Sequence, residues 1–247
     1  MEKLNITIQQ QQAYDLIAST YTSFFLTGKA GSGKTTFLRR VQNEIDKNFI
    51  VLAPTGVAAI LAGGQTIHSF FGFPLEALPI GSIGTINQER YNIIKNVDTI
   101  IIDEVSMVDA ALMSSLLKAM PRDCKLILVG DKDQLPSVGA GNVLADILES
   151  GTVKFCMLKK IFRQEEKSLI ITNAHLINEG KMPMIDNTSM DFFFESKNDP
   201  EIIKNTILEL TTVRLPKFLK VDAQQIQVLA PLKAGVCGIE NLNKELQ

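Results

Sequence analysis

The sequence predicts an α/β fold in which a parallel β-sheet is covered by helices on both faces. Short β-branched or aromatic runs alternate with segments of helical periodicity, which is the pattern of a parallel sheet. Residues of unusual chemistry follow these runs directly, at the edge where ligands bind in open α/β sheets. We expect strands over residues 23–27, 49–53, 99–103, 126–130, 155–158 and 226–230.

Composition indicates a soluble globular protein. The chain has 247 residues, of which 45% are hydrophobic, and no apolar run is long enough to cross a bilayer. The amino terminus lacks the pattern of a signal peptide, and the three cysteines are far apart, as expected for free thiols in the cytoplasm. A net charge of −2 does not indicate nucleic-acid binding, but a local groove can still be basic.

The first expected strand leads into a complete Walker A loop, Gly-Lys-Ala-Gly-Ser-Gly-Lys-Thr over residues 28–35. Its glycines let backbone N–H groups converge on phosphates, while Lys34 reaches the outer phosphates and Thr35 offers a hydroxyl to Mg²⁺. The alternative is an ordinary glycine-rich turn with the same residues, but strand, loop and helix follow in the order that a nucleotide-binding P-loop requires. The expected nucleotide contacts are Gly28, Ala30, Gly31, Ser32, Gly33, Lys34, Thr35 and Thr36.

Two further strands end in polar residues. The run Ile100–Ile102 leads into Asp103 and Glu104, which in a phosphoryl-transfer site hold Mg²⁺ and polarise the attacking water, respectively. Glu104 therefore indicates hydrolysis as well as binding. The next run leads to Gln134, whose amide can sense a γ-phosphate. Taken alone, this second segment would be interpreted as a turn.

These segments resemble the motifs of superfamily 1 helicases of the 5′-to-3′ group, the RecD-like and Pif-like DNA helicases. The resemblance extends over nearly the whole chain and implies a P-loop NTPase with a RecA-like sheet. Residues 25–37 are similar to motif I, 52–59 to motif Ia, 66–71 to the stretch after it, 103–107 to motif II, 130–136 to motif III and 161–164 to motif IV.

The resemblance also implies roles for further residues. Arg163 is similar to the family's phosphate-contacting arginine, although a surface arginine is the alternative. Gln10 or Gln11 is similar to the glutamine that reads adenine, but consecutive glutamines leave the register open, and a solvated helix start fits as well. The implied contacts to single-stranded DNA are Pro54, Thr55, Gly56, Thr66, His68 and Phe70, with Phe71 left in the core. For 54–56 an ordinary turn is the alternative, and for His68 a place at the edge of the core.

We expect residues 1–165 to form the RecA-like ATPase domain, with a small insertion at about 74–96. Residues 166–247 are expected to hold linker helices and the incomplete start of a second RecA-like domain, with a linker or small insertion over 181–198. The family's motifs V and VI are absent, so the chain resembles a truncated helicase that does not unwind DNA alone. The implied partners are single-stranded DNA, the second motor domain and proteins of repair and recombination, with no membrane.

Two other function classes fit parts of the pattern. A nucleotide-dependent switch or clamp that binds protein partners would explain the absent motifs, but it has no need for Glu104, Gln134 and Arg163 together. A small-molecule kinase would need an arginine-rich lid, and the sequence has no such cluster. We therefore expect the ATPase part of a DNA helicase that uses ATP and Mg²⁺.

Overall fold

The computed structural model describes residues 7–19, 22–29, 31–45, 48–74, 88–158 and 168–247. The chain divides into two compact units, residues 1–183 and 184–247. The boundary between them lies within the segment 181–198, whereas we expected the ATPase domain to end at residue 165. The helix α8 (Leu169–Asn178) belongs to the first unit.

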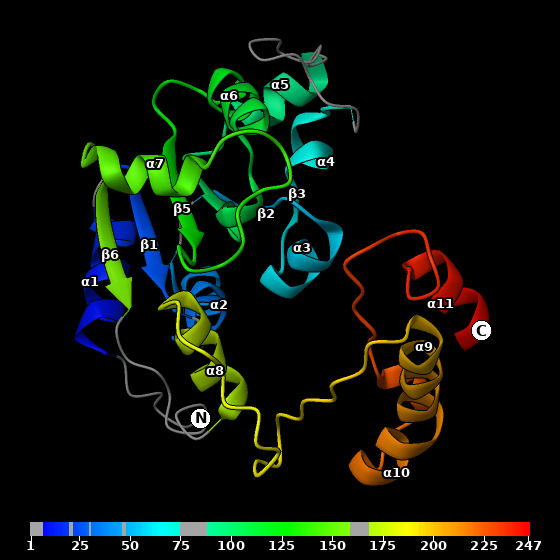
Figure 1. The fold of residues 1–247 in the computed structure, drawn as a ribbon. Helices are drawn as coiled ribbons and strands as arrows, with labels where there is room; N and C mark the ends of the chain where they lie inside the picture. Colours follow the sequence, from blue (N-terminus) through cyan, green and yellow to red (C-terminus); the bar gives the residue numbers. More distant parts are fainter. Residues whose placement is uncertain (1–6, 20–21, 30, 46–47, 75–87, 159–167) are drawn as a thin grey trace. The chain divides into compact units, whose positions relative to one another are not determined.

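The first unit is built on a six-stranded sheet in which neighbouring strands pair in parallel. This arrangement confirms the expected α/β fold (Figure 1). The sheet order is β3-β2-β4-β5-β1-β6. Its strands are β1 (Phe24–Gly28), β2 (Phe49–Ala53), β3 (Gln65–Thr66), β4 (Thr99–Ile102), β5 (Lys125–Gly130) and β6 (Lys154–Leu158).

Alternate residues of the buried strands serve the two faces of the sheet. In β1, Phe24 and Leu26 pack into one core cluster and Phe25 packs into the other. Helices α1, α2 and α3 contribute to the first cluster, while α4, α5, α6 and α7 contribute to the second. The helices are α1 (Ile8–Ser19), α2 (Lys34–Glu44), α3 (Gly56–Ala62), α4 (Ile67–Phe71), α5 (Gln88–Ile94), α6 (Ala110–Ala119) and α7 (Val143–Ser150), with a short 3₁₀ turn η1 (Val105–Met107) after β4.

A buried lysine fastens α1 to the sheet. Lys125, at the start of β5, is only 2% exposed, and its ammonium donates a hydrogen bond of 2.6 Å to the carbonyl of Leu16. The same ammonium lies 5.6 Å from the centre of the Phe24 ring. Carbonyls near the end of a helix favour a cation, so this contact stabilises the position of α1.

The second unit is helical. Its elements are α9 (Pro200–Glu209), the π-helical turn η2 (Leu210–Arg214), α10 (Leu215–Leu219), the 3₁₀ turn η3 (Ala223–Gln225) and α11 (Ile239–Leu246). Pro216 explains the π turn, because proline lacks an N–H and its ring crowds the carbonyl four residues earlier.

The strand expected over 226–230 is wrong. Residues 184–247, all of which the structure describes, contain no strand, so this segment has no partner strand there with which to form a ladder. Throughout the described ranges, no helix combines the length and the apolar character needed to cross a membrane.

Candidate functional site

The Walker A loop connects β1 to α2. Gly31 and Gly33 have φ angles of 76° and 82°, a left-handed conformation that side chains other than glycine rarely adopt. The second of these glycines caps α2, so the helix begins at Lys34. The Ser32 hydroxyl is buried and has no hydrogen-bond partner among the described residues. The loop therefore has the backbone geometry of a phosphate-binding turn at a helix N-terminus.

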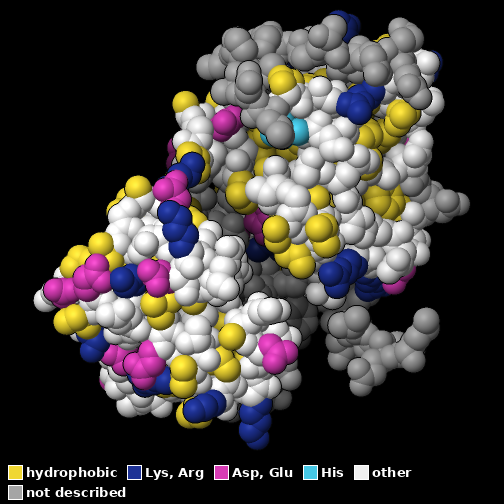
Figure 2. All heavy atoms as spheres, turned by 90° about the vertical axis from the view of Figure 1, so that its right-hand side faces the viewer, with side chains coloured by type: hydrophobic (Ala, Val, Ile, Leu, Met, Phe, Trp, Pro, Cys, Tyr) yellow, Lys and Arg dark blue, Asp and Glu magenta, His cyan; other side chains and the backbone are white. Residues whose placement is uncertain are grey.

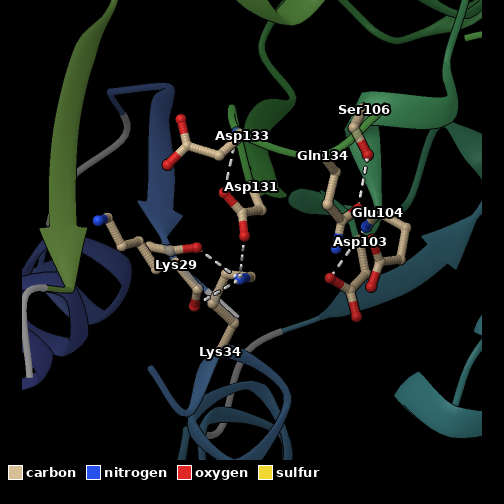
Figure 3. A network of polar contacts seen from close by, with 9 residues as sticks. Lys29, Lys34, Asp103, Glu104, Ser106, Asp131, Asp133 and Gln134 are labelled. Carbon is tan, nitrogen blue, oxygen red and sulfur yellow. Dashed lines mark hydrogen bonds and ion pairs between the residues drawn. The ribbon is translucent and has the colours of Figure 1, made fainter. Parts of the chain in front are cut away.

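Lys34 lies at the centre of the polar network in Figure 3. Its ammonium donates hydrogen bonds to the carbonyls of Gly28 at 2.6 Å and Lys29 at 3.2 Å, and it lies 4.0 Å from Asp131 Oδ2. The side chain is only 10% exposed. The P-loop lysine is thus held above the loop with its charge directed at carboxylates of neighbouring strands.

Asp103 and Glu104 follow β4 at the same edge of the sheet. Burial raises the pKa of the Asp103 carboxyl, against the opposing effects of the Glu104 N–H donated to it and of Lys34. Burial, together with the nearby Asp103 charge, also raises the pKa of Glu104. Glu104 has a left-handed backbone, with φ of 53°, which is uncommon away from glycine and is found at functional sites. Burial thus raises the pKa of both adjacent carboxyls, and Lys34 opposes the rise in each.

Gln134 is joined to the turn that follows these carboxylates. Ser106 Oγ, in η1, donates a hydrogen bond of 3.1 Å to Gln134 Oε1. The turn approaches β5 closely, because a Cβ on Gly130 would lie only 2.8 Å from Val105 Cγ1. A side chain at Gly130 would push the turn away, so this glycine permits the contact between Ser106 and Gln134.

Asp131 is a site residue that the sequence reasoning did not assign. It follows β5, the strand that pairs with β1, and its carboxylate is buried beside Lys34. The signal was present in the sequence, because a carboxylate that directly follows a strand can meet the P-loop. That signal identifies Asp131 as a site residue only when β5 is known to lie next to β1, and the sequence pattern does not reveal this strand order.

The structure distinguishes the two candidate glutamines. Gln10 is buried and forms a capping box at the start of α1: Gln10 Oε1 accepts the Thr7 N–H, and Thr7 Oγ1 accepts the Gln10 N–H. Gln11 is exposed, and its amide donates to Asp15 Oδ1 at 2.8 Å. The side chain of Gln10 is therefore held by the helix start, whereas that of Gln11 lies on the surface.

The residues expected to contact DNA meet at one edge of the sheet. Ala53 pairs with Thr66, which brings Pro54, Thr55 and Gly56 next to the start of α4. The hydroxyls of Thr55 and Thr66 accept the N–H groups of Ala58 and Ser69, so both threonines act as helix caps.

The aromatic residues of this edge differ in exposure. His68 is half-buried, and its ring meets the Phe73 ring edge-on. Phe70 is only 6% exposed and belongs to the core, so its ring offers little surface to a base. Nearby, the helix α3 exposes the hydrophobic side chains of Val57, Ile60 and Leu61. Figure 2 shows one face of the molecule, on which exposed hydrophobic side chains are scattered among lysines and arginines.

A family model described as an AAA domain matches residues 5–193. The chain belongs to this family. It is 31% identical over 235 residues to the ATP-dependent RecD2 DNA helicase of Deinococcus radiodurans, covering 90% of this chain and 30% of that protein. It is 37% identical over 153 residues to the ATP-dependent DNA helicase Pif1 of Bdellovibrio bacteriovorus, covering 56% of this chain and 34% of that protein.

The fold of this AAA domain is also that of solved Pif1 structures. A Bacteroides Pif1 helicase in complex with ADP-AlF3 and single-stranded DNA aligns with a TM-score of 0.60 and 31% identity, covering 72% of this chain and 47% of that one. The resemblance inferred from the motifs is thereby confirmed: the chain corresponds to the N-terminal ATPase portion of superfamily 1 helicases of the Pif1 and RecD type. It spans roughly a third of the length of the first curated relatives.

Two residues expected at the site of the AAA domain, Ala30 and Arg163, lie outside the described residues. The hydroxyl of Thr35 and the carboxylate of Asp103 are hard oxygen donors, which suit Mg²⁺. The part of the chain that the structure describes holds no group of three or more His, Cys, Asp or Glu side chains placed to bind a metal. This donor set fits Mg²⁺ all the same, since that ion usually takes one or two protein ligands together with phosphates and water.

Proposed function

We propose that this chain is the ATPase module of a 5′-to-3′ DNA helicase, which binds and hydrolyses ATP with Mg²⁺ and contacts single-stranded DNA. The observation that carries the proposal is the position of Lys34. Its ammonium lies at the mouth of the P-loop, 4.0 Å from Asp131 and close enough to Asp103 and Glu104 to influence both carboxyl pKa values. A cation over a P-loop beside these carboxylates supports phosphoryl transfer.

Each residue has a step in this mechanism. Loop amides of residues 28–33 and the Lys34 ammonium bind the phosphates, while Thr35 and Asp103 would hold Mg²⁺, which supplies charge neutralisation at the phosphates. Glu104, once ionised, accepts a proton from the attacking water. Gln134, oriented by Ser106, contacts the γ-phosphate. Gln10 is the better candidate for reading adenine, since its contacts with Thr7 fix its side chain at the start of α1, whereas Gln11 is exposed and bonded to Asp15 on the surface.

Single-stranded DNA is proposed to run along the edge formed by residues 54–56 and 66–68. The adjacency of Ala53 and Thr66 supports one continuous contact surface there. The Pif1 relative crystallised with single-stranded DNA supports the same class of ligand. His68, half-buried at the rim, is the side chain of this edge best suited to meet a base, and Phe70 is left to the core.

A nucleotide-binding assay tests the proposal. Lys34→Ala is expected to abolish binding of a fluorescent ATP analogue at micromolar protein while preserving the thermal unfolding transition, because the ammonium contacts loop carbonyls and has no part in the core clusters. Lys132→Ala is a matched control, because that lysine is largely exposed and its ammonium pairs with Asp133 rather than with the P-loop. Unchanged affinity in the Lys34 variant would remove the P-loop assignment.

The runner-up is a nucleotide-dependent switch that binds protein partners. The geometry of the site favours hydrolysis, because a switch has no need for Glu104 beside Asp103 and for Gln134 bonded to Ser106. ATP hydrolysis that is stimulated by single-stranded DNA in a protein extended by a second motor domain would support the helicase. Hydrolysis without DNA stimulation or strand separation on a 5′-tailed substrate would support the switch.

A further inference from the structure

Asp131 makes two separate contacts with its two carboxylate oxygens. Oδ2 lies 4.0 Å from the Lys34 ammonium, and Oδ1 accepts the backbone N–H of Asp133 at 3.0 Å. The side chain is only 5% exposed. One buried carboxylate therefore connects the P-loop lysine with the segment that leads to Gln134, as Figure 3 shows.

Among the described residues, negative groups outnumber positive ones around Lys34. Asp103, Glu104 and Asp131 all lie near this single ammonium. Burial and the Asp103 charge raise the pKa of Glu104 most, and the Asp131 charge adds a smaller rise. A phosphate that binds the P-loop must share the ammonium with Asp131 or displace it. The carboxylate also repels a bound phosphate directly, because a side chain that is only 5% exposed is weakly screened by solvent.

We propose that Asp131 is a positioning residue that competes with the nucleotide phosphates for Lys34. In this arrangement Asp131 weakens anion binding, which favours release of the product nucleotide. When Lys34 turns to the phosphates, Asp131 loses its cation, and the change reaches the Gln134 segment through the Asp133 N–H. This inference rests on the proposed function, because it needs a nucleotide at the P-loop.

Asp131→Asn separates the charge from the backbone contact. The asparagine Oδ1 can still accept the Asp133 N–H, but the negative charge beside Lys34 is gone. We expect the affinity for fluorescent ADP and ATP analogues, measured in EDTA so that no Mg²⁺ takes part, to rise about fivefold, as removal of one nearby buried like charge predicts. A merely structural role would leave affinity unchanged or lower it.

Asp199→Asn is the matched control. Asp199 also accepts backbone N–H groups, those of Glu201 and Ile202, but it caps α9 in the second unit. This variant should bind both nucleotides like the parent. Equal or weaker binding by Asp131→Asn, with an unfolding transition like that of the parent, would overturn the proposal. A parent protein that binds no nucleotide would instead refute the proposed function itself.

A measurement on the unmodified protein tests the same proposal if the Asp131→Asn variant does not fold. Amide hydrogen exchange of the segment 131–134 is followed with and without ADP in EDTA. Loss of the Lys34 partner should loosen the Asp131 carboxylate, so exchange in this segment should accelerate several-fold when ADP binds. Exchange that stays the same, or slows, while ADP is shown to bind would overturn the proposal.

Discussion

Removal of the Ser106 hydroxyl should lower the free energy of unfolding slightly and the rate of ATP turnover much more. Ser106 is only 5% exposed, and its Oγ donates to Gln134 Oε1 at 3.1 Å. A hydrogen bond of this kind contributes about 1 kcal/mol to the free energy of unfolding. For a chain of this size, that loss corresponds to a melting temperature lower by roughly 2–4 °C. Since Gln134 is exposed, water can solvate its freed amide, which keeps the loss near this value.

The effect on ATP turnover should be larger than the effect on stability. Without Ser106 the Gln134 amide samples several rotamers, so it contacts the γ-phosphate only part of the time. We expect Ser106→Ala to lower kcat about tenfold, less than the roughly 100-fold or more that follows complete loss of a positioned polar contact at a reacting centre, because the Gln134 amide is still present. Steady-state ATPase assays and thermal unfolding of the same preparation measure the two effects.

Ser115→Ala provides the comparison. Ser115 lies in α6, is fully buried and donates its hydroxyl to the carbonyl of Ala111 at 2.9 Å. The substitution removes a buried hydroxyl outside the nucleotide site, so it should lower stability by a similar amount and leave kcat unchanged. Equal turnover by the Ser106 and Ser115 variants would refute the idea that Ser106 orients Gln134.

Three further predictions concern catalysis, DNA and a thiol. Glu104→Gln should bind ATP normally and lower kcat by about 100-fold or more in an ATPase assay, because the amide cannot accept the water proton. Thr55→Ala and His68→Ala should each weaken binding of single-stranded DNA in low-salt fluorescence anisotropy, and parental binding should itself fade as salt rises. Burial raises the Cys124 pKa to about 11 from an ordinary 9.0, so iodoacetamide labelling near pH 8, followed by mass spectrometry, should be about 100-fold slower than for an ordinary thiol. Because the folded state holds this proton more tightly, its stabilising effect should be lost as pH rises from 9.0 towards 11.

The sheet could be predicted from the sequence where a strand is long and apolar. The run Ile100–Ile102 is buried on both faces, so its pattern alone identifies β4 and places Asp103 at its end. By contrast, β3 consists of Gln65 and Thr66 and carries no hydrophobic signal. Its pairing with β2 is a consequence of the tertiary fold, which a local pattern does not contain.

The error at residues 226–230 has a related cause. The run Ile226–Ala230 has the β-branched character of a strand, but a strand exists only where a neighbour supplies hydrogen-bond partners. In residues 184–247 the structure contains no such neighbour. Local propensity therefore predicts a strand wrongly here, because pairing depends on residues far away in the sequence.

The contacts of the site depend in the same way on which strands are neighbours. Motif order identifies Lys34, Asp103 and Gln134 as candidates, since each follows an expected strand. Their coupling arises because β1 pairs with β5 and β5 pairs with β4, which brings Asp131 to Lys34 and Ser106 to Gln134. Ser106 carries no distinctive local signal, and the position of Asp131 after a strand becomes informative only once β5 is known to lie beside β1. Both residues nevertheless contact the lysine or the glutamine of the site. Variants of these two residues therefore test the arrangement of the site, whereas variants of Lys34 and Glu104 test only its chemistry.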